Sequence, residues 1–174
     1  HARPDLDIKS IRGNLDTRLK KLESGEYDAI ILAAAGLRRL GQADRITQLL
    51  DNALMVPAVG QGALCIETRQ DDPEMARVMA ALDHESTRIC VMGERAFLKQ
   101  IEGSCHIPVA CFASMDQGRV NMTAMVASED GARLIRKERT SDTGSARSAG
   151  RELAQELLES GGKDILENLN THDS

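Results

Sequence analysis

An unbroken apolar run, Ala29 to Ala33, constrains the fold of this chain more than any other feature. A strand with one face in water alternates apolar and polar side chains, whereas every position of this run is apolar. That pattern is typical of a strand in a parallel sheet that helices cover on both faces. A helix is predicted over residues 14–24, with Asn14 as its N-cap and Gly25 at its end, so helix and strand together indicate an α/β unit.

The first half of the chain does not supply a whole parallel sheet. Residues 63–68 form the other predicted strand, and Pro57, Gly60 and Gly62 make the segment before it a hinge or crossing. We therefore expect a longer protein, in which residues upstream of His1 provide the neighbouring strands. The alternative is that the second half of the chain or a partner chain covers these edges. Two helices complete this half, at residues 44–50 and 73–82.

The second half predicts a self-contained α+β domain. A long helix is expected from about residue 84 to Ile101, with apolar side chains along one face. Asp116-Gln117-Gly118 and Asp130-Gly131 provide the turns of an antiparallel meander. Its strands are predicted at residues 108–115, 119–127 and 132–139, and the closing helices at residues 145–158 and 164–169.

Composition and charge exclude several classes of function. Aromatic residues make up 2% of the 174 residues and the formal net charge is −5, so a module that stacks bases or binds nucleic acid over a basic surface is not expected. No apolar run reaches the roughly 18–20 residues that span a membrane, and no secretory signal is visible. The four cysteines form no Cys-x-x-Cys pair, and a reducing cytoplasm is the simplest setting.

One cysteine differs from the other three in its surroundings. Cys105 lies in EGSCHIPVA (102–110), after a predicted helix end and among small, polar and turn-forming residues. Two interpretations stay open: a functional thiol, or a loop thiol without a role. A zinc site made by Cys105, His106 and Cys111 fits no common ligand spacing, so no metal site is expected. The cysteines that we expect to be small buried apolar residues are Cys65, Cys90 and Cys111.

Arginines gather at two places where α/β proteins bind anions. Arg12 precedes the predicted cap at Asn14 and Arg18 lies one turn inside the helix, where free backbone N–H groups favour an anion. Arg38 and Arg39 directly follow the predicted strand, whose end is a common place for a ligand. Guanidinium groups bind carboxylates in planar pairs, so a polycarboxylate ligand is one interpretation and solvated surface charge is the other.

Several stretches together resemble the porphobilinogen deaminase family, whose members are also called hydroxymethylbilane synthases. Ser104 stands where glycine is common in that family, which is a small departure. Family members have three domains of similar size, and this chain resembles only their C-terminal half or somewhat more. The matching stretches, in the family's order, are RGNLDTRL (12–19), GEYDAIIL (25–32), LAAAGLRRLG (32–41), PAVGQGALCIETR (57–69) and ERAFLKQIEGSCHIPVA (94–110).

The resemblance implies a domain assignment and a fold class. Residues 1–56 match the later part of domain 2, residues 57–82 return to complete domain 1, and residues 83–174 form domain 3, which carries the cofactor. The implied fold class is α/β and α+β. It comprises part of a two-lobe α/β unit like that of periplasmic binding proteins, and then a small α+β domain with a three-stranded antiparallel sheet and helices.

The resemblance also implies a transferase. In the family a loop cysteine, here Cys105, carries a dipyrromethane cofactor through a thioether. Four porphobilinogen units add head to tail to this primer with loss of ammonia, and water then releases hydroxymethylbilane, a tetrapyrrole on the route to haem. The family's catalytic aspartate lies upstream of His1, so no catalytic residue is expected here and the chain alone is expected to be inactive. The positions that match cofactor- and substrate-binding residues are Arg12, Asn14, Arg18, Leu32, Ala33, Gly36, Arg39 and Gln61.

Porphobilinogen is the partner that the resemblance implies, and the full-length family is expected to be monomeric. Exposed strand edges are expected to let this chain associate with itself. The alternative to an enzyme is a non-enzymatic two-lobe domain that binds a small polycarboxylate ligand reversibly, in which Cys105 is incidental.

Overall fold

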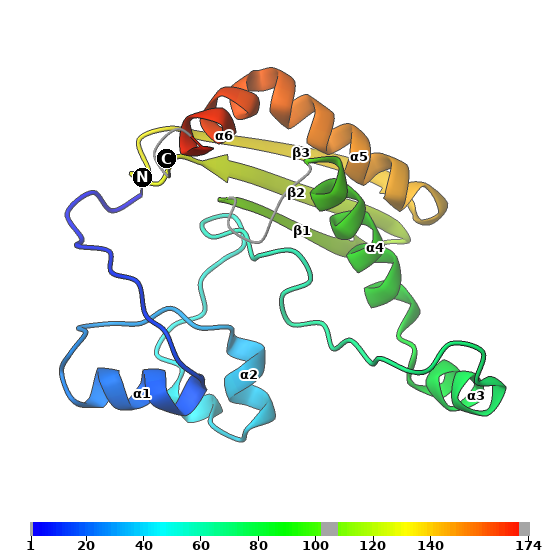
Figure 1. Ribbon diagram of the computed structural model, residues 1–174, viewed down its shortest axis with the longest axis horizontal. Coiled ribbons are helices and arrows are strands. Elements are labelled where there is room, and N and C mark those ends of the chain that lie inside the picture. Colours follow the sequence, from blue (N-terminus) through cyan, green and yellow to red (C-terminus); the bar gives the residue numbers. More distant parts are fainter. Residues whose placement is uncertain (1, 102–107, 171–174) are drawn as a thin grey trace. The chain divides into compact units, whose positions relative to one another are not determined.

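The computed structural model describes residues 2–101 and 108–170. These residues form two compact units, an N-terminal unit from Ala2 to Asp51 and a C-terminal unit that begins at Asn52 (Figure 1). The elements, in chain order, are α1 (Leu15–Glu23), α2 (Ala34–Arg39), the 3₁₀ helix η1 (Ala43–Arg45), α3 (Pro73–Leu82), α4 (Glu85–Gln100), β1 (Val109–Asp116), β2 (Arg119–Ala127), β3 (Leu134–Asp142), the 3₁₀ helix η2 (Thr143–Ser145), α5 (Ala146–Leu157), the π turn η3 (Leu158–Gly162) and α6 (Lys163–Asn170).

The C-terminal unit is built on an antiparallel sheet in the order β1-β2-β3, which confirms the predicted meander. The two-residue turn between β1 and β2 is Gln117-Gly118, with φ of 47° and 76°. Positive φ at both central residues matches the right-handed twist of a hairpin, and glycine adopts it without strain. β3 starts at Leu134, two residues later than predicted, after the turn that contains Gly131.

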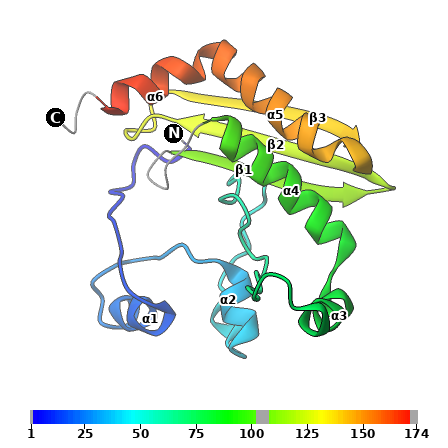
Figure 2. The same ribbon diagram turned by 45° about the vertical axis from the view of Figure 1, so that its right-hand side comes forward.

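Helices α4 and α5 lie over one face of this sheet (Figures 1 and 2). Alternate side chains of β2 point into that layer and are buried, whereas the positions between them are partly exposed. α5 packs a stripe of small and aliphatic residues against the sheet and against α4. The largest fully buried side chains, which form the centre of the core, are Phe97, Met122, Leu153, Leu157, Val120, Val126 and Cys111.

Two glycines set the distance between α4 and α5. A Cβ atom added at Gly150 of α5 would lie 2.1 Å from the carbonyl oxygen of Gly93 on α4. A Cβ at Gly93 would lie 3.1 Å from the carbonyl oxygen of Ala146 and 3.3 Å from the side chain of Met122. The helix backbones therefore touch where they cross, and no larger residue fits at Gly150 without moving one helix.

The N-terminal unit contains α1 and α2, each with one buried leucine, Leu19 and Leu37. Asn14 caps α1 as predicted, since its side-chain oxygen accepts a hydrogen bond from the Thr17 backbone N–H at 2.9 Å. Two contacts between residues distant in sequence also hold this unit. Tyr27 donates its hydroxyl to the Ser10 carbonyl at 3.2 Å, and Arg45 pairs with Glu23 at 2.7 Å.

The two strands predicted in the first half of the chain, which would need neighbouring strands to pair with, do not form. Within residues 2–101 no strand forms, so the segments 29–33 and 63–68 run without a ladder, and Ile31 is 60% exposed. A strand requires a second backbone beside it, and the described residues provide none for these segments. The helix predicted at residues 44–50 shrinks to η1, and α2 forms where we predicted only the end of a strand.

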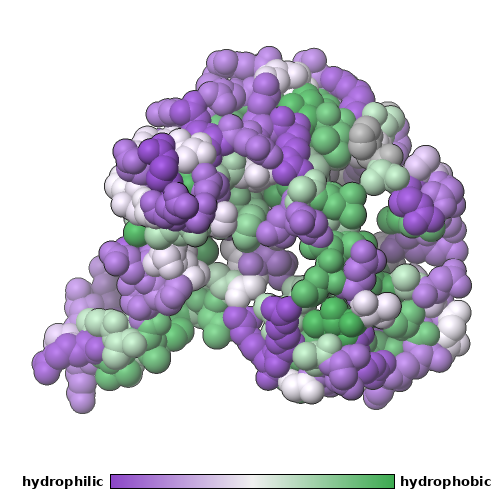
Figure 3. All heavy atoms as spheres, turned by 180° about the vertical axis from the view of Figure 1, so that it is seen from behind, coloured by the Kyte–Doolittle hydropathy of each residue, from purple (hydrophilic) through white to green (hydrophobic). Residues whose placement is uncertain are grey.

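Helix α3 was predicted correctly from its cap. Asp72 accepts a hydrogen bond from the Met75 N–H at 3.0 Å, and Pro73 occupies the first turn, where its missing N–H costs nothing. None of its residues is buried. Figure 3 shows hydrophobic side chains at the surface of the part of the chain that contains α3, and Val78 and Leu82 are among the exposed ones.

The predicted domain boundaries at residues 56/57 and 82/83 concern the longer protein and stay predictions. The division between the two compact units falls nearby, between Asp51 and Asn52.

Gly150→Ala should destabilise the C-terminal unit by about 1–3 kcal/mol, because the new methyl group would drive α5 away from the Gly93 carbonyl. Gly144→Ala is the matched control, since an added Cβ there meets nothing within 4 Å, and its effect should stay within about 0.5 kcal/mol. Urea unfolding of the 174-residue chain followed by circular dichroism measures both. Equal midpoints for the two variants would show that the crossing tolerates a methyl group.

Candidate functional site

The first group of predicted binding residues surrounds the N-terminus of α1. The Asn14 side-chain oxygen accepts from both the N–H and the hydroxyl of Thr17, at 2.9 and 2.8 Å. Arg18 folds back and donates its Nε–H to the Gly13 carbonyl at 2.9 Å, while Arg12 is exposed. Two guanidinium groups thus belong to the end of a helix whose free N–H groups already favour negative charge. Such an end suits a carboxylate ligand.

The second group lies at α2. Leu32 and Ala33 precede the helix, and Ala33 begins it through its carbonyl, which accepts the Gly36 N–H at 3.0 Å. An added Cβ at Gly36 would meet nothing within 4 Å, so this helix face is open. Arg39 closes the helix and is exposed. Our expectation that Arg38 and Arg39 directly follow a strand is corrected, because both belong to the last turn of a helix.

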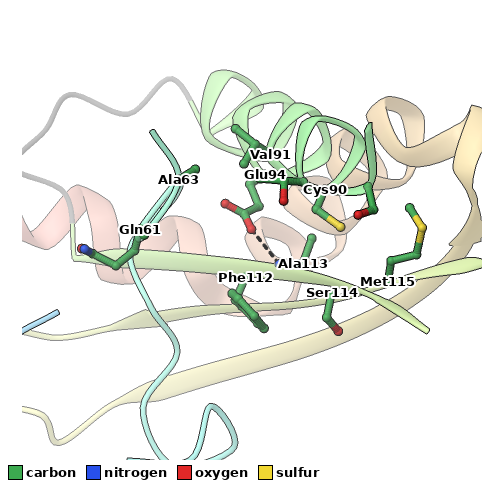
Figure 4. A pocket seen from close by; sticks show the side chains of 12 residues that line it. Gln61, Ala63, Cys90, Val91, Glu94, Phe112, Ala113, Ser114 and Met115 are labelled. Carbon is green, nitrogen blue, oxygen red and sulfur yellow. Dashed lines mark hydrogen bonds between the residues drawn. The ribbon is translucent and has the colours of Figure 1, made fainter. Parts of the chain in front are cut away.

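Gln61, the remaining predicted binding residue apart from Cys105, belongs to the C-terminal unit. Its backbone N–H donates to the Ala58 carbonyl at 2.9 Å, within a turn that contains Gly60 at φ +72°. It borders a hollow of about 430 Å³ (Figure 4). Three elements line this hollow: the segment 61–63, the first half of α4, and residues 112–115 of β1.

The carboxylate of Glu94, which sequence reasoning missed, joins those three elements. Glu94 lies on α4 and is 4% exposed. Its Oε2 accepts the Gly60 N–H at 2.7 Å and its Oε1 accepts the Ala113 N–H at 2.8 Å. Burial raises the pKa of this carboxyl group, and the two backbone hydrogen bonds act in the opposite direction. The sequence did contain a signal, since Glu94 interrupts an apolar helical stripe between Cys90 and Phe97.

The cysteines divide differently from our expectation. Cys90 and Cys111 are buried as predicted, and the pKa of each thiol is raised by burial and, to a smaller extent, by the Glu94 charge. Cys65 is exposed, because the strand that was to bury it does not form. Cys105 falls in the range 102–107, outside the described residues, and so do Gly103 and His106.

Two other kinds of site are absent from the described part of the chain. Within residues 2–101 and 108–170, no cluster of three His, Cys, Asp or Glu side chains could hold a metal ion. In the same ranges, no helix is long and apolar enough to cross a bilayer.

Comparison with known proteins identifies a class and then a family. A family model described as "Porphobilinogen deaminase, dipyromethane cofactor binding domain" matches residues 1–77. A second model, "Porphobilinogen deaminase, C-terminal domain", matches residues 88–159. The chain belongs to the porphobilinogen deaminase family. The first match contains the arginine groups and Gln61, and the second covers α4, the sheet and α5.

Curated relatives support the same assignment. Proteins named porphobilinogen deaminase from an Exiguobacterium species, Synechococcus elongatus and Chlorobium phaeovibrioides are 50%, 48% and 46% identical to this chain. The alignments cover 97%, 97% and 94% of this chain, but only 55%, 53% and 54% of the relatives. The chain therefore spans about half the length of the proteins that it matches. The individual binding roles of the predicted residues stay predictions.

A thiol reagent should discriminate among the cysteines of the folded chain. We expect N-ethylmaleimide at pH 8 to label Cys65, and to leave Cys90 and Cys111 unlabelled until urea unfolds the protein, because burial shields both thiols and raises the pKa of each. Peptide mass mapping in a Cys105→Ser background measures the labelling. Labelling of Cys111 as fast as that of Cys65 would contradict the buried placement.

Proposed function

We propose that this chain is the later half of a porphobilinogen deaminase, a transferase of tetrapyrrole and haem biosynthesis. The full enzyme would join four porphobilinogen units head to tail with loss of ammonia, and water would release hydroxymethylbilane. The observation that carries the proposal is the match of two porphobilinogen deaminase domains, in order, over residues 1–77 and 88–159. None of the comparisons favours the alternative, a non-enzymatic binding domain. The cytoplasmic setting stays a prediction.

The arginines suit the cofactor that the first family model names. A dipyrromethane built from porphobilinogen carries acetate and propionate groups, and Arg12 and Arg18 supply guanidinium donors at a helix N-terminus. Arg39 supplies a third at α2. We propose that these residues bind the carboxylates of the cofactor and the growing chain. Asn14 orders the start of α1. From the family resemblance we also propose Leu32, Ala33, Gly36 and Gln61 as residues that contact this ligand.

Cys105 is the proposed attachment point. Its sulfur would bond to the methylene carbon of a porphobilinogen-derived unit as the bond from that carbon to the amino nitrogen breaks. The nitrogen leaves with its electron pair as ammonia and takes up the thiol proton. When bound, the dipyrromethane supplies a pyrrole end on which the next unit is added. The buried thiols of Cys90 and Cys111 are poor candidates for this step, because burial disfavours the thiolate.

The unpaired segments support a missing N-terminal half. Residues 29–33 and 63–68 are apolar or mixed stretches without a ladder, and Leu64 and Ile66 are 75% and 54% exposed. We propose that the rest of the protein supplies the neighbouring strands of a two-lobe α/β unit, together with the catalytic aspartate. In that arrangement residues 1–56 belong to domain 2, residues 57–82 return to domain 1, and residues 83–174 form domain 3. The full enzyme would be monomeric, whereas the chain alone would associate through these segments.

A covalent pyrrole adduct should form on Cys105 and on no other cysteine. When the chain is extended by the N-terminal half that its relatives contain and is given porphobilinogen, intact mass should rise by the dipyrromethane. Cys105→Ala should abolish the adduct and leave the melting temperature close to that of the parent. Peptide mapping locates the modified thiol. An adduct on Cys65, Cys90 or Cys111 would contradict the assignment.

The 174-residue chain alone should consume no porphobilinogen. Arg12, Arg18 and Arg39 provide one wall of the proposed cleft, and positioning against a second wall can supply about 7–11 kcal/mol of a barrier. The assay follows porphobilinogen loss by the chain with and without the separately purified N-terminal half. Turnover by the chain alone, at a rate near that of the mixture, would show that the missing half is dispensable.

A further inference from the structure

The Glu94 carboxylate is placed where three pieces of chain meet. One is α4, on which it lies; the second is β1, through the Ala113 N–H; the third is the Gln61 segment, residues 57–63, through the Gly60 N–H. Figure 4 shows Glu94 directed from α4 toward Ala113, with the side chain of Gln61 pointing away from it. The side-chain amide of Gln61 therefore takes no part in the hydrogen bond between Gly60 and Glu94.

The two contacts use the two oxygens of one carboxylate. Each Glu94 oxygen receives one backbone N–H, and both bonds involve a charged acceptor shielded from water. A glutamine in the same place offers one oxygen and one NH₂ group, so one of the two N–H groups would face another donor. Val59, which is partly buried and packs against the core, is an apolar contact of the same segment.

The two stems that flank residues 102–107, which are α4 and β1, both belong to this group of contacts. α4 ends at Gln100, about two turns after Glu94, and β1 begins at Val109, four residues before Ala113. Residues 102–107 connect these stems, and Cys105 belongs to that connection. One carboxylate therefore fastens both stems to the segment that carries Gln61.

We propose that Glu94 is a positioning residue, whose carboxylate holds the Gln61 segment at a fixed orientation to α4 and β1, the two elements that flank residues 102–107. The inference rests on the proposed function, because it assigns Gln61 and Cys105 to one cofactor. Glu94 touches no substrate in this account. It determines where the Gln61 segment lies relative to α4 and β1, which flank residues 102–107, and so how the growing chain would be aligned for each addition.

The first test is amide hydrogen exchange on the 174-residue chain, in the wild type and in Glu94→Gln. Loss of a hydrogen bond to the charged group should speed exchange of the Gly60 amide by about 10- to 150-fold, while the Met122 and Ala124 amides of β2 stay within about twofold. Glu85→Gln, on the exposed first turn of the same helix, is the control and should change none of them. If Glu94→Gln does not fold, Glu94→Asp replaces it, because the shorter side chain keeps the charge but cannot span both donors.

The second test uses the chain extended by the N-terminal half of its relatives. Glu94→Gln should lower kcat for porphobilinogen by about tenfold or more, with KM within about twofold, since alignment and not carboxylate binding is lost. Glu85→Gln should match the wild type.

Three results would overturn the inference. These are unchanged Gly60 exchange in a folded variant, equal acceleration at Gly60, Met122 and Ala124, or faster Gly60 exchange with unchanged kcat. If the wild-type enzyme forms no adduct and turns over no porphobilinogen, the proposed function fails. The exchange measurements then still decide whether Glu94 fixes the segment.

Discussion

The close crossing of α4 and α5 at Gly93 and Gly150 is the contact on which the C-terminal unit depends. A sheet of three strands offers a narrow apolar face, and two helices cover it only if they lie nearly in backbone contact. The small residues Ala146 and Ala149 of α5 continue that approach. Because α4 is thereby held down on β1, Glu94 reaches Ala113 across the edge of the sheet. The glycine pair thus sets the position of Glu94 relative to β1.

Local signals in the sequence were sufficient for α3 and for the antiparallel sheet of the C-terminal unit. Gln117-Gly118 specified a hairpin, and Asp72 and Pro73 specified a helix start. The period of α4 predicted a core face that includes Phe97 and Ile101, which are buried, but also Met92 and Ala96, which are half-buried. Local signals gave a wrong prediction where an element needs a neighbouring strand to pair with. Residues 29–33 carry the composition of a buried strand, yet a strand is stabilised by its neighbours, and none lies within the described chain. Ala34 to Arg39 form a helix because alanine and arginine favour it once no ladder competes.

The candidate site was predictable in part for the same reason. Asn14 and Arg18 act within one turn of helix, so their local roles follow from spacing alone. Glu94 contacts Gly60 and Ala113, which lie 34 and 19 residues away, and no periodicity reveals such a pairing. For Cys65 the local signal was misleading. Its apolar sequence neighbours predicted a buried thiol, but no described residues cover it and it is exposed.

The Glu94 carboxylate also bears on how this molecule avoids assembling with itself. β1 lies at the edge of its sheet, and an edge strand presents unpaired N–H and carbonyl groups to any extended chain. The Ala113 N–H is already taken by a side chain of the same molecule, and the charge behind it disfavours the carbonyl oxygens of an incoming strand. An edge strand whose N–H group is already hydrogen-bonded within its own molecule pairs poorly with a strand of another copy. Other unpaired backbone, such as the stretches around Ile31 and Leu64, is then where association between copies is expected to begin.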